Sequence, residues 1–225
     1  VRHTAITMVS IVKNSKRYFN FYLLDCGITT ENLEKLNLLD LGSNTLQIIK
    51  PKLLEIFEKF PLPKRLSPAT FYRLLIAEIL KNVDKAIYLD SDVVVQGDLG
   101  ALWDVDLGNN LLGAVENYYY DYFKKYVFHK KNIGLSNDSH YFNAGVLLLN
   151  LKELRDYKLL EKSLTYLENH HYSLLKWHDQ DLLNIFIDRK RFLALSVCCN
   201  FCPSSTFKYY KGSLPDVQIC VHHTH

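Results

Sequence analysis

The chain has 225 residues, of which 48% are hydrophobic and 23% charged, a balance typical of globular proteins. This much apolar material can bury a substantial core, which excludes an intrinsically disordered chain. The 27 basic and 24 acidic residues leave a formal net charge of +3, which is too even to indicate a nucleic-acid partner.

The sequence predicts neither a transmembrane helix nor a secretion signal. The longest uncharged apolar run, Ala144–Leu149, is far shorter than the roughly 20 residues that span a bilayer. The segment Val1–Thr4 has none of the features of a signal peptide. Five cysteines, an odd number, occur in a chain too long to need disulfides for stability, which favours a reducing, cytoplasmic setting.

Short apolar runs alternate with longer periodic segments from the N-terminus onward. We predict a strand over Phe19–Leu24, then a helix near Thr30, the expected N-cap, and a second strand over Leu46–Lys50. Ser67 suits the N-cap and Pro68 the first position of a helix that runs on through residues 69–80.

The rest of the chain continues this alternation, and no linker rich in glycine, proline or serine divides it. Further strands are predicted over Ala86–Leu89, Leu111–Val115, Gly145–Leu149 and Val217–Val221, and further helices over Lys152–Leu167 and Gln180–Ile187. Strands that alternate with helices indicate one α/β domain, over residues 1–225, with a mostly parallel sheet.

Two aspartates follow the predicted strand Ala86–Leu89 with one residue between them. Asp90 and Asp92 project to the same side of an extended chain, so two hard oxygen ligands can face one cation. Such a pair suits Mg²⁺ or Mn²⁺ that bridges to substrate phosphates, and ligands of α/β sheets bind beyond the carboxyl ends of strands. A solvated turn after a strand is the alternative.

The order and spacing of several segments resemble glycosyltransferase family 8, which has the GT-A fold and includes retaining, metal-dependent lipopolysaccharide galactosyl- and glucosyltransferases and glycogenin. The resemblance covers nearly the whole chain. It rests on Leu24–Ile28, Thr70–Leu74, Asp90–Asp92, Leu102–Gly108, His140–Leu151, Trp177–Asn184 and Cys220–Thr224.

The resemblance implies a metal site. Asp90 and Asp92 match the family's D-x-D pair, which holds Mn²⁺ (or Mg²⁺) against the UDP diphosphate, with Ser91 beside the donor. His222 matches the third protein ligand, and an imidazole is acceptable to Mn²⁺. A tail histidine without a metal role, or a purification remnant, is the alternative for His222.

Donor-binding residues are implied in the same way. Arg73 would place a positive charge near the diphosphate, and a surface arginine is the alternative. Asn117 stands where the family commonly has an aspartate that contacts sugar hydroxyls. The segment Asn143-Ala144-Gly145 would line the sugar pocket, although a turn before a buried strand explains it equally.

Asp179 and Gln180 match the catalytic pair that faces the donor sugar. Asp179 would hold sugar hydroxyls, or alternatively act only as the N-cap of a helix that begins at Gln180. Because an amide is a poor nucleophile, a double displacement through a carboxylate is not clearly supplied. A front-face route, in which the departing phosphate oxygen helps to deprotonate the acceptor, stays open beside it.

The acceptor implied by the resemblance is a glycan or a lipid-linked glycan such as lipooligosaccharide, with peripheral contact to the inner face of the membrane. The run Tyr118–Lys131 mixes aromatic and basic residues and would cover the acceptor groove; a nucleic-acid surface or a solvated face are alternatives. Cys199 and Cys202 with His222 and His225 form a weaker zinc pattern.

Relative to the family, we expect a chain shortened at both ends. The family's first strand would precede Val1, and the segment that clasps the diphosphate would follow His222. The alternatives to an active hexosyltransferase are therefore a catalytically impaired fragment that at most binds UDP-sugar, or a self-glucosylating enzyme similar to glycogenin.

Overall fold

The computed structural model describes residues 1–52, 55–60, 67–117, 124–170, 172–201 and 221–223. The chain divides into two compact units. Unit 1 comprises Val1–Pro51, Leu89–Val105 and Ser196–His225, and unit 2 comprises Lys52–Tyr88 and Asp106–Leu195. Each unit is therefore assembled from segments that are far apart in the sequence.

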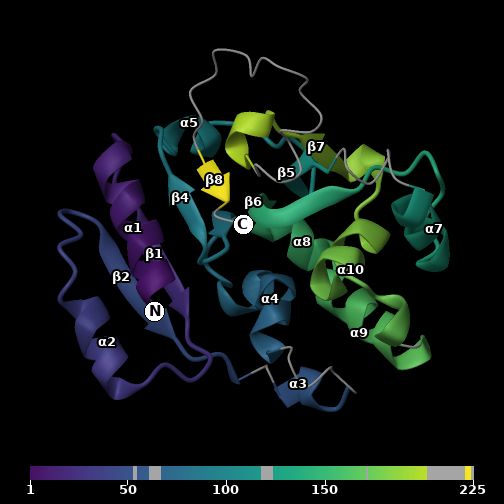
Figure 1. Ribbon diagram of the computed structural model, residues 1–225, viewed down its shortest axis with the longest axis horizontal. Coiled ribbons are helices and arrows are strands. Elements are labelled where there is room, and N and C mark those ends of the chain that lie inside the picture. Colours follow the sequence, from purple (N-terminus) through teal and green to yellow (C-terminus); the bar gives the residue numbers. More distant parts are fainter. Residues whose placement is uncertain (53–54, 61–66, 118–123, 171, 202–220, 224–225) are drawn as a thin grey trace. The chain divides into compact units, whose positions relative to one another are not determined.

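Unit 1 begins with two helices and two strands (Figure 1): α1 (Arg2–Asn14), β1 (Asn20–Leu24), α2 (Thr30–Asn37) and β2 (Thr45–Ile49). The strands pair in parallel, from Asn20 opposite Thr45 to Leu24 opposite Ile49. Met8 of α1, Leu36 of α2 and Leu41 form the buried core that holds these elements together. Both predicted strands are confirmed with shifts of one residue at their ends.

The N-cap of α2 differs from the prediction. Thr29 has the extended conformation of a cap, and its side chain accepts a hydrogen bond from the backbone N–H of Asn32. Thr30 is already the first helical residue. Two neighbouring threonines suit the cap equally, so the sequence signal does not distinguish them.

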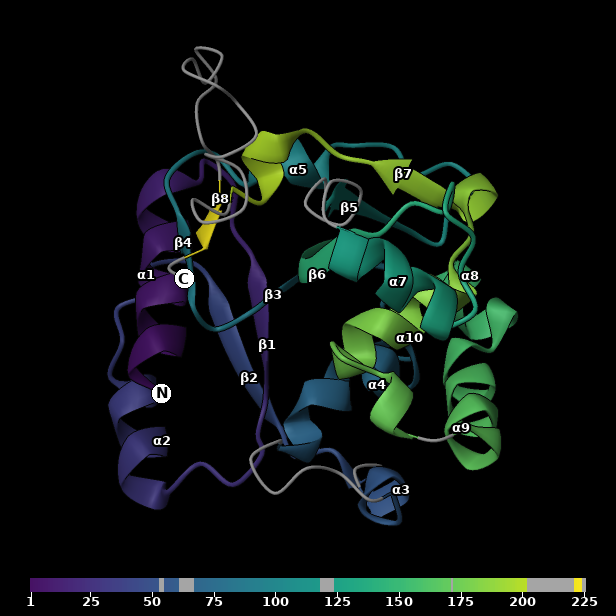
Figure 2. The ribbon, with the colours of Figure 1, turned by 45° about the vertical axis from the view of Figure 1, so that its right-hand side comes forward.

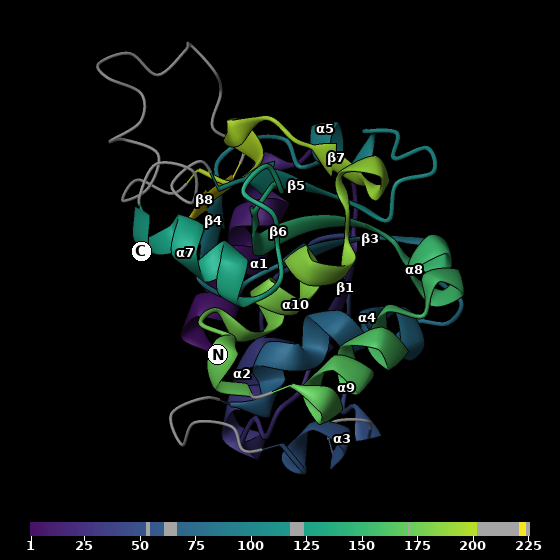
Figure 3. The ribbon, with the colours of Figure 1, turned by 90° about the vertical axis from the view of Figure 1, so that its right-hand side faces the viewer.

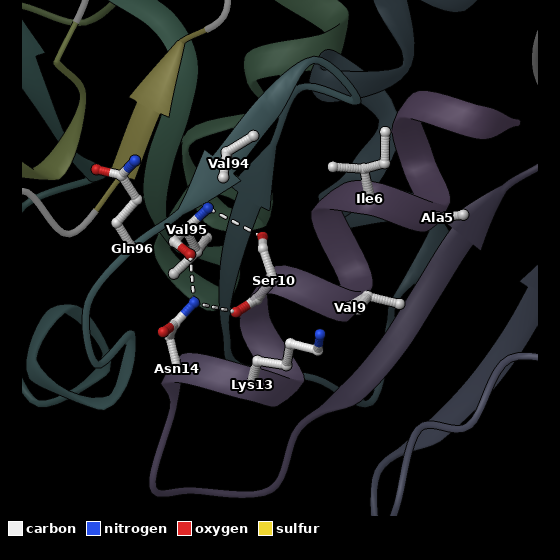
Figure 4. Close-up of a pocket in the computed structure, with 9 residues that line it drawn as sticks. All are labelled: Ala5, Ile6, Val9, Ser10, Lys13, Asn14, Val94, Val95 and Gln96. Carbon is white, nitrogen blue, oxygen red and sulfur yellow. Dashed lines mark hydrogen bonds between the residues drawn. The ribbon is translucent and has the colours of Figure 1, made fainter.

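The remaining described elements of unit 1 are β4 (Val93–Val95), α5 (Gly100–Trp103), the 3₁₀ turn η5 (Val197–Cys199) and β8 (Val221–His223). Polar side chains of α1 bind the backbone of β4 (Figure 4): Ser10 Oγ accepts from the Val95 N–H at 2.9 Å, and Asn14 Nδ2 donates to the Val95 carbonyl at 2.8 Å. Thr7 Oγ1 lies 2.7 Å from the Val93 carbonyl oxygen. Helix α1 therefore satisfies one edge of β4, while β8 pairs antiparallel with it.

Unit 2 is built on a four-stranded sheet in the order β3-β6-β5-β7. Its strands are β3 (Lys85–Leu89, whose last residue belongs to unit 1), β5 (Leu112–Glu116), β6 (Phe142–Asn150) and β7 (Phe192–Ala194). Strand β5 runs antiparallel to β6 and parallel to β7, so the sheet is mixed. Strand β6 is buried over most of its length, as expected for a central strand.

The helices of unit 2 are α3 (Glu55–Glu58), α4 (Tyr72–Ile79), α7 (Lys124–Asn132), α8 (Leu151–Tyr157), α9 (Leu159–Asn169) and α10 (His178–Phe186). Short 3₁₀ turns occur at η2 (Pro68–Phe71), η3 (Tyr172–Leu174) and η4 (Arg189–Arg191). Helix α10 packs beside β6, and α4 contacts α8, α9 and α10 (Figures 2 and 3). The α/β fold class with a mixed sheet and flanking helices is confirmed.

Two helix predictions need correction. The segment after Pro68 starts as the 3₁₀ turn η2, capped by Ser67, and becomes α-helical only at Tyr72. The single helix predicted over Lys152–Leu167 is two helices, because Lys158 adopts a left-handed conformation with φ of 56° between α8 and α9. Lysine gives no sequence signal for such a break, which is usually made by glycine.

The strand predicted over Gly145–Leu149 is longer in the structure and starts at Phe142. Asn143, Ala144 and Gly145 therefore lie within β6, not in a turn that precedes it. The prediction for Val217–Val221 falls almost entirely outside the described residues. In the described part of the chain, no helix is long and apolar enough to cross a bilayer.

Candidate functional site

The predicted metal-binding pair lies in unit 1, in the connection between β3 and β4. Asp90 and Asp92 are half-buried and Ser91 is exposed. The connection is held from α1, because Thr7 Oγ1 lies 3.0 Å from the Ser91 carbonyl oxygen and 2.7 Å from that of Val93. The two carboxylates thus belong to a connection whose backbone is held in place by the buried side chain of Thr7.

Strand β8 brings His222 to the same part of unit 1. In its antiparallel register with β4, His222 pairs with Val94 and His223 with Val93, the residue that directly follows Asp92. The side chain of His222 is outside the described part of the structure. Among the side chains that are described, no group of three or more His, Cys, Asp or Glu residues could hold a metal ion. Asp90 and Asp92 offer the oxygen donors that Mg²⁺ and Mn²⁺ prefer, so the residues present fit such a cation.

The second group of predicted residues lies in unit 2, around a buried ion pair. Arg73 of α4 places its Nε 2.6 Å from Asp179 Oδ2, and the two side chains are only 11% and 8% exposed. The Arg73 guanidinium also lies over the Tyr88 ring, 4.7 Å from its centroid. Arg73 is therefore no surface arginine, which removes that alternative.

Helix α4, which carries Arg73, is itself anchored at its C-terminal end. Arg155 of α8 places Nη1 3.2 to 3.3 Å from the carbonyl oxygens of Ala77, Leu80 and Val83. Ala77 lies in the last turn of α4, where carbonyls lack partners within the helix, and the guanidinium supplies one. The position of Arg73 along the helix axis is fixed as a result.

The peptide groups on either side of Ala144 join α4, β6 and α10. Arg73 Nη1 donates to the Ala144 carbonyl at 2.6 Å, and the Ala144 N–H donates to Gln180 Oε1 at 2.9 Å. The next N–H, that of Gly145, donates to Asn143 Oδ1 at 2.8 Å. Six predicted site residues, including the Asp179 partner of Arg73, are thereby brought together in one unit.

Asn117 reaches the same end of the sheet through its backbone. Its N–H donates to the Tyr141 carbonyl at 2.7 Å, directly before β6 begins. The preceding residue, Glu116, forms an ion pair with His140. The end of β5 and the start of β6 are thus tied together where Asn117 and Asn143 stand.

The start of α10 excludes the interpretation of Asp179 as a helix cap. Trp177 is the N-cap residue and makes no side-chain capping bond, and Asp179 is the second helical residue. His178, between them, has a left-handed φ of 49°. Non-glycine residues with this conformation are costly and concentrate at functional sites. Asp179 is therefore held by Arg73 at a strained helix start.

The site in unit 2 also includes four residues to which the sequence analysis gave no role: His129, Tyr141, Asp181 and Asn184. Asn184 accepts from the Phe142 N–H at 2.8 Å and donates to the Phe142 carbonyl at 3.0 Å, which fastens α10 to the start of β6. Tyr141 and Asp181 stand inside segments that carried the family resemblance, and only their neighbours received a role. His129 lies on α7, within the run Tyr118–Lys131 that was predicted to cover the acceptor groove, and received no role of its own.

Two other predictions stay untested. Cys202 and His225 of the zinc pattern lie outside the described residues, as does the start of the aromatic and basic run at 118–123.

An open groove of about 390 Å³ in unit 1 is lined by α1 and β4 residues such as Ile6, Val9 and Val94 (Figure 4). None of the predicted site residues lines it.

Comparison with known proteins identifies relatives over the whole length of the chain. The model of the family described as glycosyl transferase family 8 matches residues 1–211. A protein of Haemophilus influenzae is 36% identical over 183 residues, which cover 81% of this chain and 54% of the relative. A lipopolysaccharide 1,2-glucosyltransferase of Escherichia coli is 29% identical over 234 residues, covering 98% of this chain and 67% of the enzyme.

Among solved structures, the galactosyltransferase LgtC in complex with donor and acceptor sugar analogs matches with a TM-score of 0.84 at 29% identity. The match covers 98% of this chain and 82% of that one. The chain spans about half the length of several curated relatives, for example 41% of the glycosyltransferase GlyB of Streptococcus pneumoniae.

Proposed function

Because the chain belongs to glycosyltransferase family 8, we propose that it transfers galactose or glucose from a UDP-sugar to a saccharide hydroxyl with retention of configuration. The observation that carries this proposal is the pair Asp90 and Asp92 at the end of β3, in the same unit as His222. The similarity to a galactosyltransferase and a glucosyltransferase supports a hexose as the transferred group.

Asp90, Asp92 and His222 would hold the divalent cation, Mn²⁺ or Mg²⁺. When bound, the cation would supply Lewis-acid neutralisation of the charge on the departing UDP. Two carboxylates and one imidazole favour Mn²⁺ over Mg²⁺, because Mn²⁺ accepts nitrogen ligands more readily. Ser91, whose backbone is held by Thr7, would contact the donor from the same connection.

The residues of unit 2 would bind and orient the donor sugar. Asp179 would accept hydrogen bonds from sugar hydroxyls, and Arg73 keeps its carboxylate charged and oriented through their ion pair. Asn117 and Asn143 would supply further polar contacts. Gln180, whose Oε1 accepts from the Ala144 N–H, would present its amide toward the anomeric centre.

Two retaining routes stay open for this arrangement. Gln180 is an amide and a poor nucleophile, so a double displacement needs a carboxylate at the anomeric carbon. In the front-face route, the acceptor hydroxyl attacks on the side of the leaving group and passes its proton to the departing phosphate oxygen. The front-face route asks only for orientation and charge stabilisation, which the named residues can provide.

The acceptor is proposed to be a lipopolysaccharide or lipooligosaccharide sugar. The similarity to a lipopolysaccharide 1,2-glucosyltransferase supports this class. The exposed Lys131 of α7 (Lys124–Asn132) provides positive charge that suits an anionic lipid-linked glycan.

The metal assignment is tested with Asp92→Asn, which keeps the shape of the side chain and removes its charge. We expect Mn²⁺-dependent transfer from UDP-galactose or UDP-glucose to fall by at least about 10²-fold. The matched control is Asp40→Asn in the same unit, where the side chain only accepts from the Gly42 N–H. Unchanged turnover in Asp92→Asn would contradict the assignment.

The alternatives make different predictions for the unmodified chain. A catalytically impaired chain binds UDP-sugar in calorimetry but neither hydrolyses nor transfers it with Mn²⁺. A self-glucosylating enzyme gains hexose masses on its own chain after incubation with UDP-glucose alone, which mass spectrometry detects.

A further inference from the structure

A buried hydrogen-bond network behind Gln180 is not used by the proposed function. Asp181 is fully buried, and Tyr141 and His129 are 2% and 6% exposed. Asp181 Oδ1 lies 2.9 Å from His129 Nε2 and accepts from the Tyr141 hydroxyl at 2.5 Å, while Oδ2 accepts from the Trp177 N–H at 2.7 Å. Gln180 Nε2 lies 3.2 Å from the Tyr141 hydroxyl oxygen.

The bond between Tyr141 and Asp181 sets the direction of the next bond in this network. The Tyr141 hydroxyl donates its one proton to Asp181 Oδ1. The Tyr141 oxygen is then left to accept from Gln180 Nε2. The opposite end of the amide, Oε1, is consequently the acceptor that the Ala144 N–H requires.

Both ends of the Gln180 amide are therefore specified by donors and acceptors that cannot exchange roles. A glutamine side chain otherwise presents its oxygen and nitrogen interchangeably and rotates about its last torsion. Here a flip would place Nε2 against the Ala144 N–H and Oε1 against a hydroxyl whose proton already goes to Asp181. The flip would lose two hydrogen bonds in a largely buried setting.

The network ends on a residue that is only half-buried. His129, Tyr141 and Asp181 are buried, and the chain of bonds leads from α7 through α10 and the start of β6 to Gln180. The network therefore ends at the side chain that the proposed function places at the donor sugar.

We infer that Tyr141, Asp181 and His129 are positioning residues that fix the orientation of the Gln180 amide. The inference rests on the proposed function for its catalytic meaning. Asp181 accepts from the Tyr141 hydroxyl, His129 contacts the same carboxylate oxygen from α7, and the Tyr141 oxygen accepts from Gln180 Nε2. Hydrogen-bond partners that orient metal ligands, a comparable case, typically affect activity 10- to 100-fold.

The test compares Tyr141→Phe in the wild-type and in the Gln180→Ala background. Loss of the hydroxyl should lower kcat by at least about 10-fold, with KM for the UDP-sugar within about twofold. In the Gln180→Ala background the same substitution should cost less than about twofold, because its target is gone. Tyr157→Phe is the matched control: its hydroxyl donates to the Phe186 carbonyl, away from Gln180.

Equal losses from Tyr141→Phe in both backgrounds, or no loss in the wild type, would overturn the inference and leave the proposed function intact. If Gln180→Ala itself retains full turnover, the role of Gln180 in the proposed function fails instead.

An NMR readout tests the positioning without any turnover. The side-chain amide resonances of Gln180, assigned by their loss in Gln180→Ala, should be shifted from free-glutamine positions in the wild type and in Tyr157→Phe. They should move toward those positions in Tyr141→Phe. Unmoved resonances in Tyr141→Phe would overturn the inference even for an inactive chain.

Discussion

The guanidinium of Arg73 and the carboxylate of Asp179 form a buried ion pair, with Nε and Oδ2 2.6 Å apart. The pair joins α4 to the strained start of α10, and Arg73 also donates to the Ala144 carbonyl. A charge that is buried with its partner is strongly destabilising when the partner is removed. The pair therefore has consequences for stability and for turnover that can be separated.

For stability, we expect Arg73→Ala to lower the free energy of unfolding by about 3 to 5 kcal/mol, because it leaves Asp179 charged and buried. Arg17→Ala is the control, since Arg17 pairs with Asp104 at a surface where the side chains are 51% and 56% exposed. The control should cost about 1 kcal/mol or less. Urea unfolding measures the loss of unfolding free energy in both variants. Equal losses would contradict the expectation that the buried pair stabilises the protein more than the exposed pair.

For turnover, Asp179→Asn should lower kcat by about 10²-fold while UDP affinity in the presence of Mn²⁺ changes by less than about threefold. The carboxylate is proposed to hold sugar hydroxyls, and UDP alone carries none of them. Steady-state kinetics give kcat, and calorimetry with UDP in the presence of Mn²⁺ gives the UDP affinity. Equal losses in kcat and in affinity would argue against a role at the sugar.

Asn184→Ala should destabilise unit 2 by about 2 to 4 kcal/mol, because the buried N–H and carbonyl of Phe142 would both lose their partner. Asn169→Ala, whose amide donates to the Thr165 carbonyl at an exposed position, should cost less than about 1 kcal/mol. Hydrogen exchange of the Phe142 amide gives a local readout. Unchanged protection of that amide in Asn184→Ala would contradict the stabilising role of the two Asn184–Phe142 hydrogen bonds.

Asp98 makes stability depend on pH in the acid range. Hydrogen bonds from the backbone N–H groups of Gly100 and Lys16 lower the pKa of its carboxyl below the usual value. Stabilisation from a lowered pKa is present above the pKa of the unfolded state, about 3.9, and is lost as pH falls through the folded value. Wild type should therefore exceed Asp98→Asn in urea midpoint at pH 6, and the gap should close toward pH 2. A gap that widens on acidification would contradict this sign.

Local sequence patterns predicted most elements and one half of the candidate site. Apolar runs placed β1, β2, β3, β5 and part of β6, because alternation and burial in a strand are local properties of the chain. The D-x-D pair was found for the same reason, since Asp90 and Asp92 are neighbours at a strand end. Family resemblance then supplied Arg73, Asp179 and Gln180 as candidates.

The contacts that those candidates make depend on the fold and could not be predicted from local patterns. Lys158 separates α8 from α9 with a left-handed φ of 56°, although lysine favours helices, so a local pattern contains no sign of the break. Arg73 meets Asp179, and His129 meets Asp181, through helices that the fold brings together from distant parts of the chain. Pairing at long range depends on how side chains fill a shared core, whereas periodicity reports only on one element at a time.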